Sequence, residues 1–246
     1  MFETTTHTMF KQLITFLTKI NTYDSKKLNV KSTTFEDFCK NLIDTLKRKL
    51  IGDKQSDSFI LNGLIIFRIY IEEGNPECDL GLSNWDVEDW QEVQEEIIER
   101  QTILLNLDIV NLIVLILRFN DNEDIFGECM KLAIGLSLGG NLKAQACFHE
   151  CLNQSFNTSP DFKNVAGCNI LSKIKEKMDE CFKKISIVYT RKLNMSLETF
   201  YNNSNKNKDH EMVMEKIDKK AEPYIKILKK IYRFLQLLCE GHNIVL

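Results

Sequence analysis

The chain has 246 residues, of which 43% are hydrophobic and 27% charged, and this composition is typical of a folded globular protein and not of a disordered one. Its 3 prolines and 10 glycines are too few for a turn-rich β fold and favour long, uninterrupted helices. The formal net charge of −3 gives no reason to expect nucleic acid as a partner.

The 8 cysteines are scattered, and no CxxC pair occurs. In a chain of this length, that distribution indicates reduced, buried thiols in a cytosolic compartment and not a disulfide framework. The most apolar run, residues 107–117, is too short to span a bilayer and contains Asp108 and Asn111. We therefore expect a soluble chain with no signal peptide and no transmembrane segment.

Apolar residues at helical spacing predict helices throughout, and no segment alternates with period two for long, so we expect little or no sheet. In the first third of the chain, the predicted helices cover residues 9–20, 35–50 and 58–71. An acidic helix beginning at residue 87 is expected to run directly into residues 107–119. That stretch is apolar on nearly every side, which is typical of a helix buried between neighbours.

The next predicted helices cover residues 125–138, 142–152 and 170–193. The polar turn at 120–124 is expected to supply an Asp or Asn cap, and Asn141 is a good N-cap residue for the helix that follows it. The last helix is expected from residue 211 onward, with a kink favoured at Pro223. Its expected apolar face consists of Ile225, Leu228, Ile231, Leu235, Leu238 and Cys239.

Successive helices joined by short loops predict an all-α fold, specifically an armadillo-like helical solenoid. No exact repeat at a fixed period occurs, so an irregular helical bundle stays open as the alternative. The expected organisation is an N-terminal helical segment, a loop, a larger helical segment, a flexible linker and a final helical region, at 1–73, 74–86, 87–201, 202–210 and 211–246.

The nearest approach to a metal site is the group Cys147, His149, Cys151 and Cys168. On a helix, His149 points away from the face that Cys147 and Cys151 share. Core packing explains these cysteines better, so we predict no metal. The acidic run from Asp121 also fails as an EF-hand calcium loop, because apolar residues occupy ligand positions.

Six lysines lie near the last helix, at 216, 219, 220, 226, 229 and 230. An inositol phosphate or an acidic lipid surface is a conceivable partner, but a solvated helix face is the preferred interpretation of such a charge run. His242 has no recognisable catalytic partner, and no catalytic or phosphate-binding motif occurs. We therefore predict neither an enzymatic activity nor a cofactor.

Three stretches carry a likeness to a known family: RFLQLLCEGHN at 233–243, LAIGLSLGGN at 132–141 with the KAQACFHECL that follows, and IKEKMDECFKKI at 174–185. They resemble the helical solenoid of the intracellular calcium-release channels, the inositol trisphosphate and ryanodine receptors. The first resembles the start of their RIH-associated region. Gly241 favours the ryanodine form, whereas the stretch at 174–185 favours the inositol trisphosphate form, which we prefer.

The resemblance spans about residues 87–243, with an RIH-type segment at 87–201 and the start of a truncated RIH-associated region at 211–246. It implies a cytosolic regulatory and coupling segment of an inositol trisphosphate receptor-like calcium-release channel, which relays ligand binding to a pore that this chain does not contain. A ryanodine receptor-like fragment and a freestanding helical-repeat adaptor are the alternatives. The apolar face of the last helix is then expected to await helices beyond the chain.

In the parent channel, the implied partners are the remaining channel domains and neighbouring subunits of a homotetramer, at the cytosolic face of the endoplasmic reticulum membrane. The matching positions in that family pack the solenoid and bind no known ligand, so the resemblance assigns no binding residues. The family-motif residues expected to serve packing are Leu136, Gly139, Gly140, Asn141, Arg233, Phe234, Leu235, Gln236, Leu237, Leu238, Cys239, Glu240, His242 and Asn243.

Overall fold

The structure is a computed structural model that describes residues 35–50, 57–72, 90–153, 170–201 and 207–239. Within these ranges the chain is all-α, with eight α-helices, one short 3-10 helix and no strand. The elements are α2 (Phe35–Leu50), α3 (Asp57–Glu72), α4 (Trp90–Asn106), α5 (Ile109–Phe119), α6 (Glu123–Ser137), η2 (Leu138–Gly140), α7 (Leu142–Asn153), α8 (Ile170–Tyr201) and α9 (Asn207–Cys239). The all-α prediction is confirmed.

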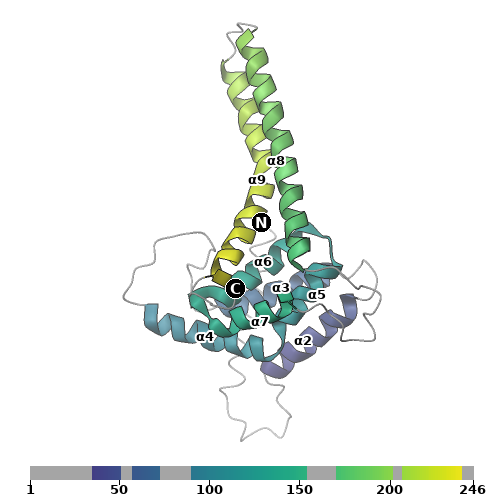
Figure 1. Ribbon diagram of the computed structural model, residues 1–246, viewed down its shortest axis with the longest axis vertical. Coiled ribbons are helices and arrows are strands. Elements are labelled where there is room, and N and C mark those ends of the chain that lie inside the picture. The colour runs from purple at the N-terminus through teal and green to yellow at the C-terminus, as the bar shows by residue number, and fades with distance from the viewer. Residues whose placement is uncertain (1–34, 51–56, 73–89, 154–169, 202–206, 240–246) are drawn as a thin grey trace, which may run out of the picture.

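Helices α2 to α7 form a body from which α8 and α9 project as a long antiparallel hairpin (Figure 1). Helix α8 has 32 residues, which corresponds to a length of about 48 Å. The N-terminal half of α9 lies antiparallel to α8, and the C-terminal half of α9 packs on α6. The hairpin is therefore anchored in the body at one end only.

The core of the body is built around α5 and α6. Eight of the 11 residues of α5 are buried, as its apolar sequence predicted, and α5 contacts helices α2, α4, α6, α7 and α8. Helix α6 is buried along most of its length between α3 and α9. These two helices place the functional candidates described below, because α7, α8 and α9 all pack against them.

The chain turns sharply between α4 and α5, where the sequence predicted an uninterrupted helix. Asp108 has φ 65° and ψ 34°, in the left-handed region that few non-glycine residues adopt. Its carboxylate accepts hydrogen bonds from Lys47 on α2, at 3.0 Å, and from Asn111, at 3.1 Å. The break follows from these contacts and from the packing of α5. No glycine or proline marks it in the sequence, so the sequence did not predict it.

The hairpin helices are longer than predicted. Helix α8 continues to Tyr201 instead of ending near residue 193, and α9 begins at Asn207, inside the linker predicted at 202–210. Polar residues weaken the apolar signal of a segment, but they extend an existing helix at low cost. Residues 202–206 and the loop predicted at 74–86 lie outside the described ranges, as does the helix predicted at 9–20.

The buried face of α9 agrees with the prediction only in part: Leu228, Ile231 and Leu238 are buried, as expected. Ile227, Phe234 and Leu237 are buried, whereas Ile225 is only partly buried and Cys239 is exposed. Helices α6, α7 and α8 cover this face. The expectation that it awaits helices beyond the chain is therefore wrong, because the body of the same chain supplies its neighbours.

Candidate functional site

The described parts of the three stretches singled out in the sequence, at 132–152, 174–185 and 233–239, meet in the interior. Side chains from α5, α6, α7, α8 and α9 surround one small apolar cavity, to which these helices contribute Leu117, Met130, Phe148, Ile174 and Phe234, among others. Phe148 follows the GGN stretch, Ile174 begins the stretch at 174–185, and Phe234 belongs to the RFLQ stretch. We call this meeting point the motif junction.

Two contacts hold α7 against α9 at the motif junction. The rings of Phe148 and Phe234 meet edge to face, with centroids 5.0 Å apart and planes at 74°. Nearby, Nε2 of Gln145 donates a hydrogen bond of 2.9 Å to the carbonyl oxygen of Leu237. Both phenylalanines are 2% exposed and Gln145 is 1% exposed, so the contacts are dry and hold the two helices in one position.

A buried amide network lies at the end of α6. Nε2 of Gln101 on α4 donates to the carbonyl oxygens of Gly135 and Leu138, at 2.8 and 3.1 Å, and its Oε1 accepts from Nδ2 of Asn141 at 2.7 Å. Asn141 in turn accepts hydrogen bonds from the first N–H groups of α7. Gln101 was missed in the sequence, because it is one of three glutamines in α4 and no local pattern distinguishes it.

The remaining family-motif residues take different positions. Leu136, Leu237 and Leu238 are buried, Arg233, Leu235 and Gly140 are partly buried, and Gly139, Gln236 and Cys239 are exposed. Gly139 and Gly140 have φ of 72° and 69°, where glycine carries no steric penalty, so they end α6. Glu240, His242 and Asn243 lie outside the described residues.

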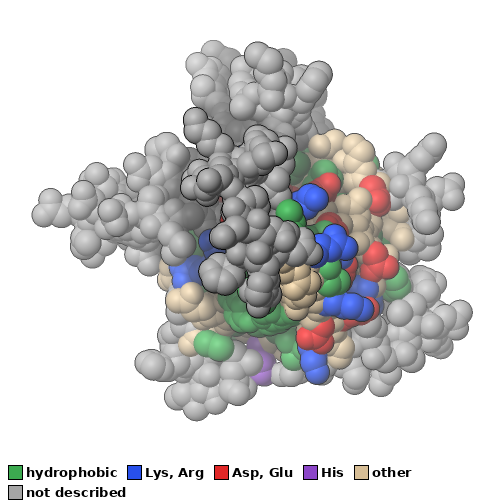
Figure 2. Space-filling model, turned by 90° about the horizontal axis from the view of Figure 1, so that it is seen from above, with side chains coloured by type: hydrophobic (Ala, Val, Ile, Leu, Met, Phe, Trp, Pro, Cys, Tyr) green, Lys and Arg blue, Asp and Glu red, His purple; other side chains and the backbone are tan. Residues whose placement is uncertain are grey.

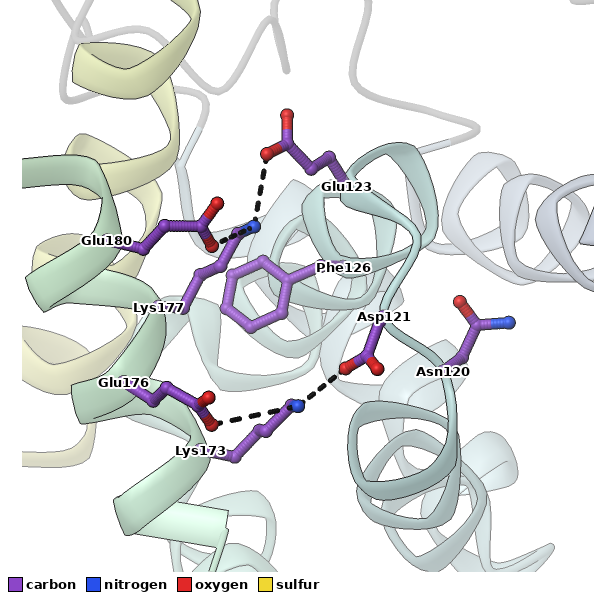
Figure 3. A pocket seen from close by; sticks show the side chains of 8 residues that line it. All are labelled: Asn120, Asp121, Glu123, Phe126, Lys173, Glu176, Lys177 and Glu180. Atoms are coloured by element: carbon purple, nitrogen blue, oxygen red, sulfur yellow. Dashed lines mark hydrogen bonds and ion pairs between the residues drawn. The ribbon is translucent and has the colours of Figure 1, made fainter. Parts of the chain in front are cut away.

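Ion pairs fasten the base of α8 to the turn between α5 and α6 (Figure 3). Lys173 lies 2.5 Å from Asp121, and Lys177 lies 3.2 Å from Glu123. Lys184, about two turns further along α8, also reaches Glu123, at 3.1 Å. The first two ion pairs border an open pocket of ≈ 310 Å³, which Phe126 and Glu180 also line. We call these lysines and carboxylates, with Glu180, the α8 clasp.

Charges in the α8 clasp neutralise one another. Hydrogen bonds from Lys177 and then Lys184 lower the pKa of Glu180 to about 2. Those from Lys184 and Lys177 also lower the pKa of Glu123, although partial burial opposes the shift. Both carboxylates therefore stay ionised at neutral pH, and they act as fixed anions that hold the lysines. Neither Glu123 nor Glu180 is therefore poised to exchange a proton near pH 7.

A second ionic cluster joins α3, α6 and α9. Arg68 pairs with Glu72 at 2.7 Å and donates to Glu128 on α6, which also pairs with Lys131 at 3.1 Å. The ammonium group of Lys230 on α9 lies close to Gly127. A Cβ atom placed on Gly127 would lie 3.3 Å from Nζ of Lys230. Burial, followed by the charge of Lys131, lowers the pKa of Lys230. The cluster thus contains one more cation than its two carboxylates balance.

The lysines near the last helix do not act as one basic patch. Lys226 pairs with Glu222 at 2.7 Å, Lys230 turns toward the second ionic cluster, and the side chain of Lys216 lies outside the described residues. Seen end-on from above, the Lys and Arg side chains that are visible lie among Asp and Glu side chains (Figure 2). This arrangement favours the solvated-face interpretation.

Metal-ligating residues do not gather in the described part of the chain, where no group of three or more His, Cys, Asp and Glu side chains could hold an ion. Cys147, His149 and Cys151 are partly buried on α7, and Cys168 lies outside the described residues. Burial raises the pKa of Cys151 to about 11, so its thiol stays protonated. These cysteines contribute apolar packing beside the core.

Among the described residues, no single helix is both long enough and apolar enough to cross a membrane. Segments Ile97–Asn106 and Ile109–Phe119 satisfy that test only as a pair, and the pair is bent by 68° at Asp108. Comparisons of the chain with protein-family models, with curated proteins and with solved structures give no match.

Proposed function

We propose that this chain is a cytosolic regulatory and coupling segment of an inositol trisphosphate receptor-like calcium-release channel, with no enzymatic role. One observation carries the proposal: three stretches that resemble those channels, and that are widely separated in the sequence, converge on the motif junction. The proposal includes armadillo-like stacking of the helices, with an irregular bundle as the alternative. The implied partners are other channel domains and subunits at the endoplasmic reticulum membrane.

The hairpin suits a coupling role mechanically. Helices α8 and α9 project from the body, and the motif junction and the α8 clasp anchor them at the base (Figure 1). A displacement of the hairpin tip would thus be transmitted to α5, α6 and α7, because close-packed cores move as units. The contact between Phe148 and Phe234 lies in the path of that movement.

A chimeric channel tests the proposal. We expect an inositol trisphosphate receptor whose corresponding segment is replaced by residues 87–239 to retain ligand-evoked calcium release from the endoplasmic reticulum. Phe234→Ala in the chimera should reduce release, and Tyr232→Ala, at a position 50% exposed on the same helix, should not. A chimera that assembles and reaches the membrane but releases no calcium would refute the coupling role.

A freestanding helical adaptor is the second candidate, and the covered face of α9 favours it, since α6, α7 and α8 already bury that face. The nucleotide sequence around the gene separates the two candidates. A channel segment predicts continuing solenoid helices and then several apolar spans of about 20 residues in the same transcript. An in-frame stop codon directly after Leu246, with no channel exons on either side, would favour the adaptor.

A further inference from the structure

Helix α8 carries a second apolar face, which is exposed. Phe182, Tyr189 and Leu193 are 47%, 43% and 60% exposed, whereas Ile174 and Cys181, on the adjoining face, are 3% and 1% exposed. At 100° per residue, the three exposed side chains project within about 40° of one another. A two-helix hairpin can cover only one face of each helix, so this second face is available to a further helix.

The exposed face is symmetric about Phe182. Leu171, which is 42% exposed, lies 11 residues before Phe182, and Leu193 lies 11 residues after it. Lys175 and Tyr189 lie 7 residues before and after. Spacings of 4, 7 and 11 residues keep side chains on one helical seam. The order of side chains is therefore matched to an antiparallel copy of the same helix.

We propose that α8 forms a two-fold, antiparallel contact with α8 of a second copy of this chain. When the two-fold axis passes at the level of Phe182, Leu171 of one copy lies level with Leu193 of the other. The two Phe182 side chains then lie level with each other. Lys175 comes level with Tyr189 of the other copy. The same patch serves both chains, as two-fold symmetry requires, and the two hairpins together form a four-helix bundle.

The charges beside the face are complementary in this arrangement. Asp179 and Lys183 are exposed on the same flank, and neither forms an ion pair with the described residues. In an antiparallel two-fold pair, each flank meets its own counterpart, so Asp179 of each copy lies within reach of Lys183 of the other. Their levels differ by two residues, about 3 Å along the axis, which both side chains can span. The proposal does not depend on the calcium-channel proposal.

Sedimentation equilibrium of the full chain over a concentration series tests the contact. We expect a monomer–dimer equilibrium that Phe182→Ser weakens by at least about tenfold, because the substitution acts twice at a symmetric interface. The matched control is Ile187→Ser, at a position 45% exposed and about 140° away around α8, which should leave the equilibrium unchanged. Circular dichroism checks that both variants keep the wild-type helix content.

Charge reversal tests the register of the pair. Asp179→Lys and Lys183→Asp should each weaken the dimer by about tenfold, and the double variant should recover most of the loss. A wild-type chain that stays monomeric throughout would overturn the proposal, and so would equal effects of Phe182→Ser and Ile187→Ser. A dimer that the double variant fails to recover would overturn the antiparallel register.

Discussion

Gln145 on α7 donates a hydrogen bond to the backbone carbonyl oxygen of Leu237 on α9, across 92 positions of the chain. Helix α9 ends at Cys239, so this carbonyl is among the last four, which have no partner within the helix. Both residues are 1% exposed. A side chain from a distant helix thus completes the hydrogen bonding of a buried helix end.

Gln145→Leu removes this donor and leaves the Leu237 carbonyl buried without a partner. We expect the free energy of unfolding to fall by about 1–3 kcal/mol in urea denaturation, the cost of an unsatisfied buried polar group. The matched control is Gln236→Leu on the exposed side of α9, expected to change stability by less than about 0.5 kcal/mol. Equal effects of the two variants would mean that the hydrogen bond contributes nothing.

The Phe148–Phe234 contact should show energetic coupling. Each single change to alanine removes a buried ring and should cost about 3–5 kcal/mol. A double-mutant cycle should then give a coupling energy of about 0.5–1.5 kcal/mol beyond the loss of buried area, because the rings meet edge to face. Pairing Phe148→Ala with Tyr232→Ala provides the control, since Tyr232 is exposed and additive effects are expected. Strict additivity for the two phenylalanines would contradict the coupling.

The α8 clasp should give an acid-dependent contribution to stability. The pKa of Glu180 falls from 4.5 to about 2 on folding, so its contribution is present above pH 4.5 and is lost as the pH falls toward about 2. The Glu180 side chain is 42% exposed, which keeps the effect below about 1 kcal/mol.

Glu180→Gln should therefore be less stable than the wild type at neutral pH, and the difference should shrink between about pH 4.5 and about pH 2. Urea midpoints measured across this range provide the test. Glu176→Gln is the control, because Glu176 is 73% exposed and lies 3.7 Å from Lys173. A difference for Glu180→Gln that is constant with pH would rule out an ionised Glu180 as the cause.

Lys230→Met should stabilise the protein. The pKa of Lys230 is lowered in the folded state, so its ammonium group carries a penalty that is fully present at neutral pH and disappears above its ordinary value of 10.5. Methionine keeps the apolar stem and removes the charge beside Lys131, and we expect a gain of about 0.5–2 kcal/mol at pH 7. Lys229→Met, at the exposed neighbouring position, should give no comparable gain. A loss of stability would show that the second ionic cluster needs this charge.

The asparagine caps illustrate what local sequence predicts well. Asn141 accepts hydrogen bonds from the N–H groups of Lys143 and Ala144, both at 3.1 Å, and Asn122 caps α6 in the same way. A cap depends on residues within a single turn, so its signal lies in a few neighbouring letters. The motif stretches were likewise visible, but their meeting at one junction was not, because periodicity says nothing about which helices become neighbours.

By itself, the sequence determined the all-α class, the approximate positions of most helices and the capping residues, since each depends on side chains a turn or two apart. Only the tertiary structure decided that the chain turns at Asp108 and that Phe234 and Leu237, instead of Cys239, face the core. It also gave Gln101 and Gln145 their partners. Those outcomes depend on competition between surfaces far apart in the chain, and that competition is settled only when the helices pack.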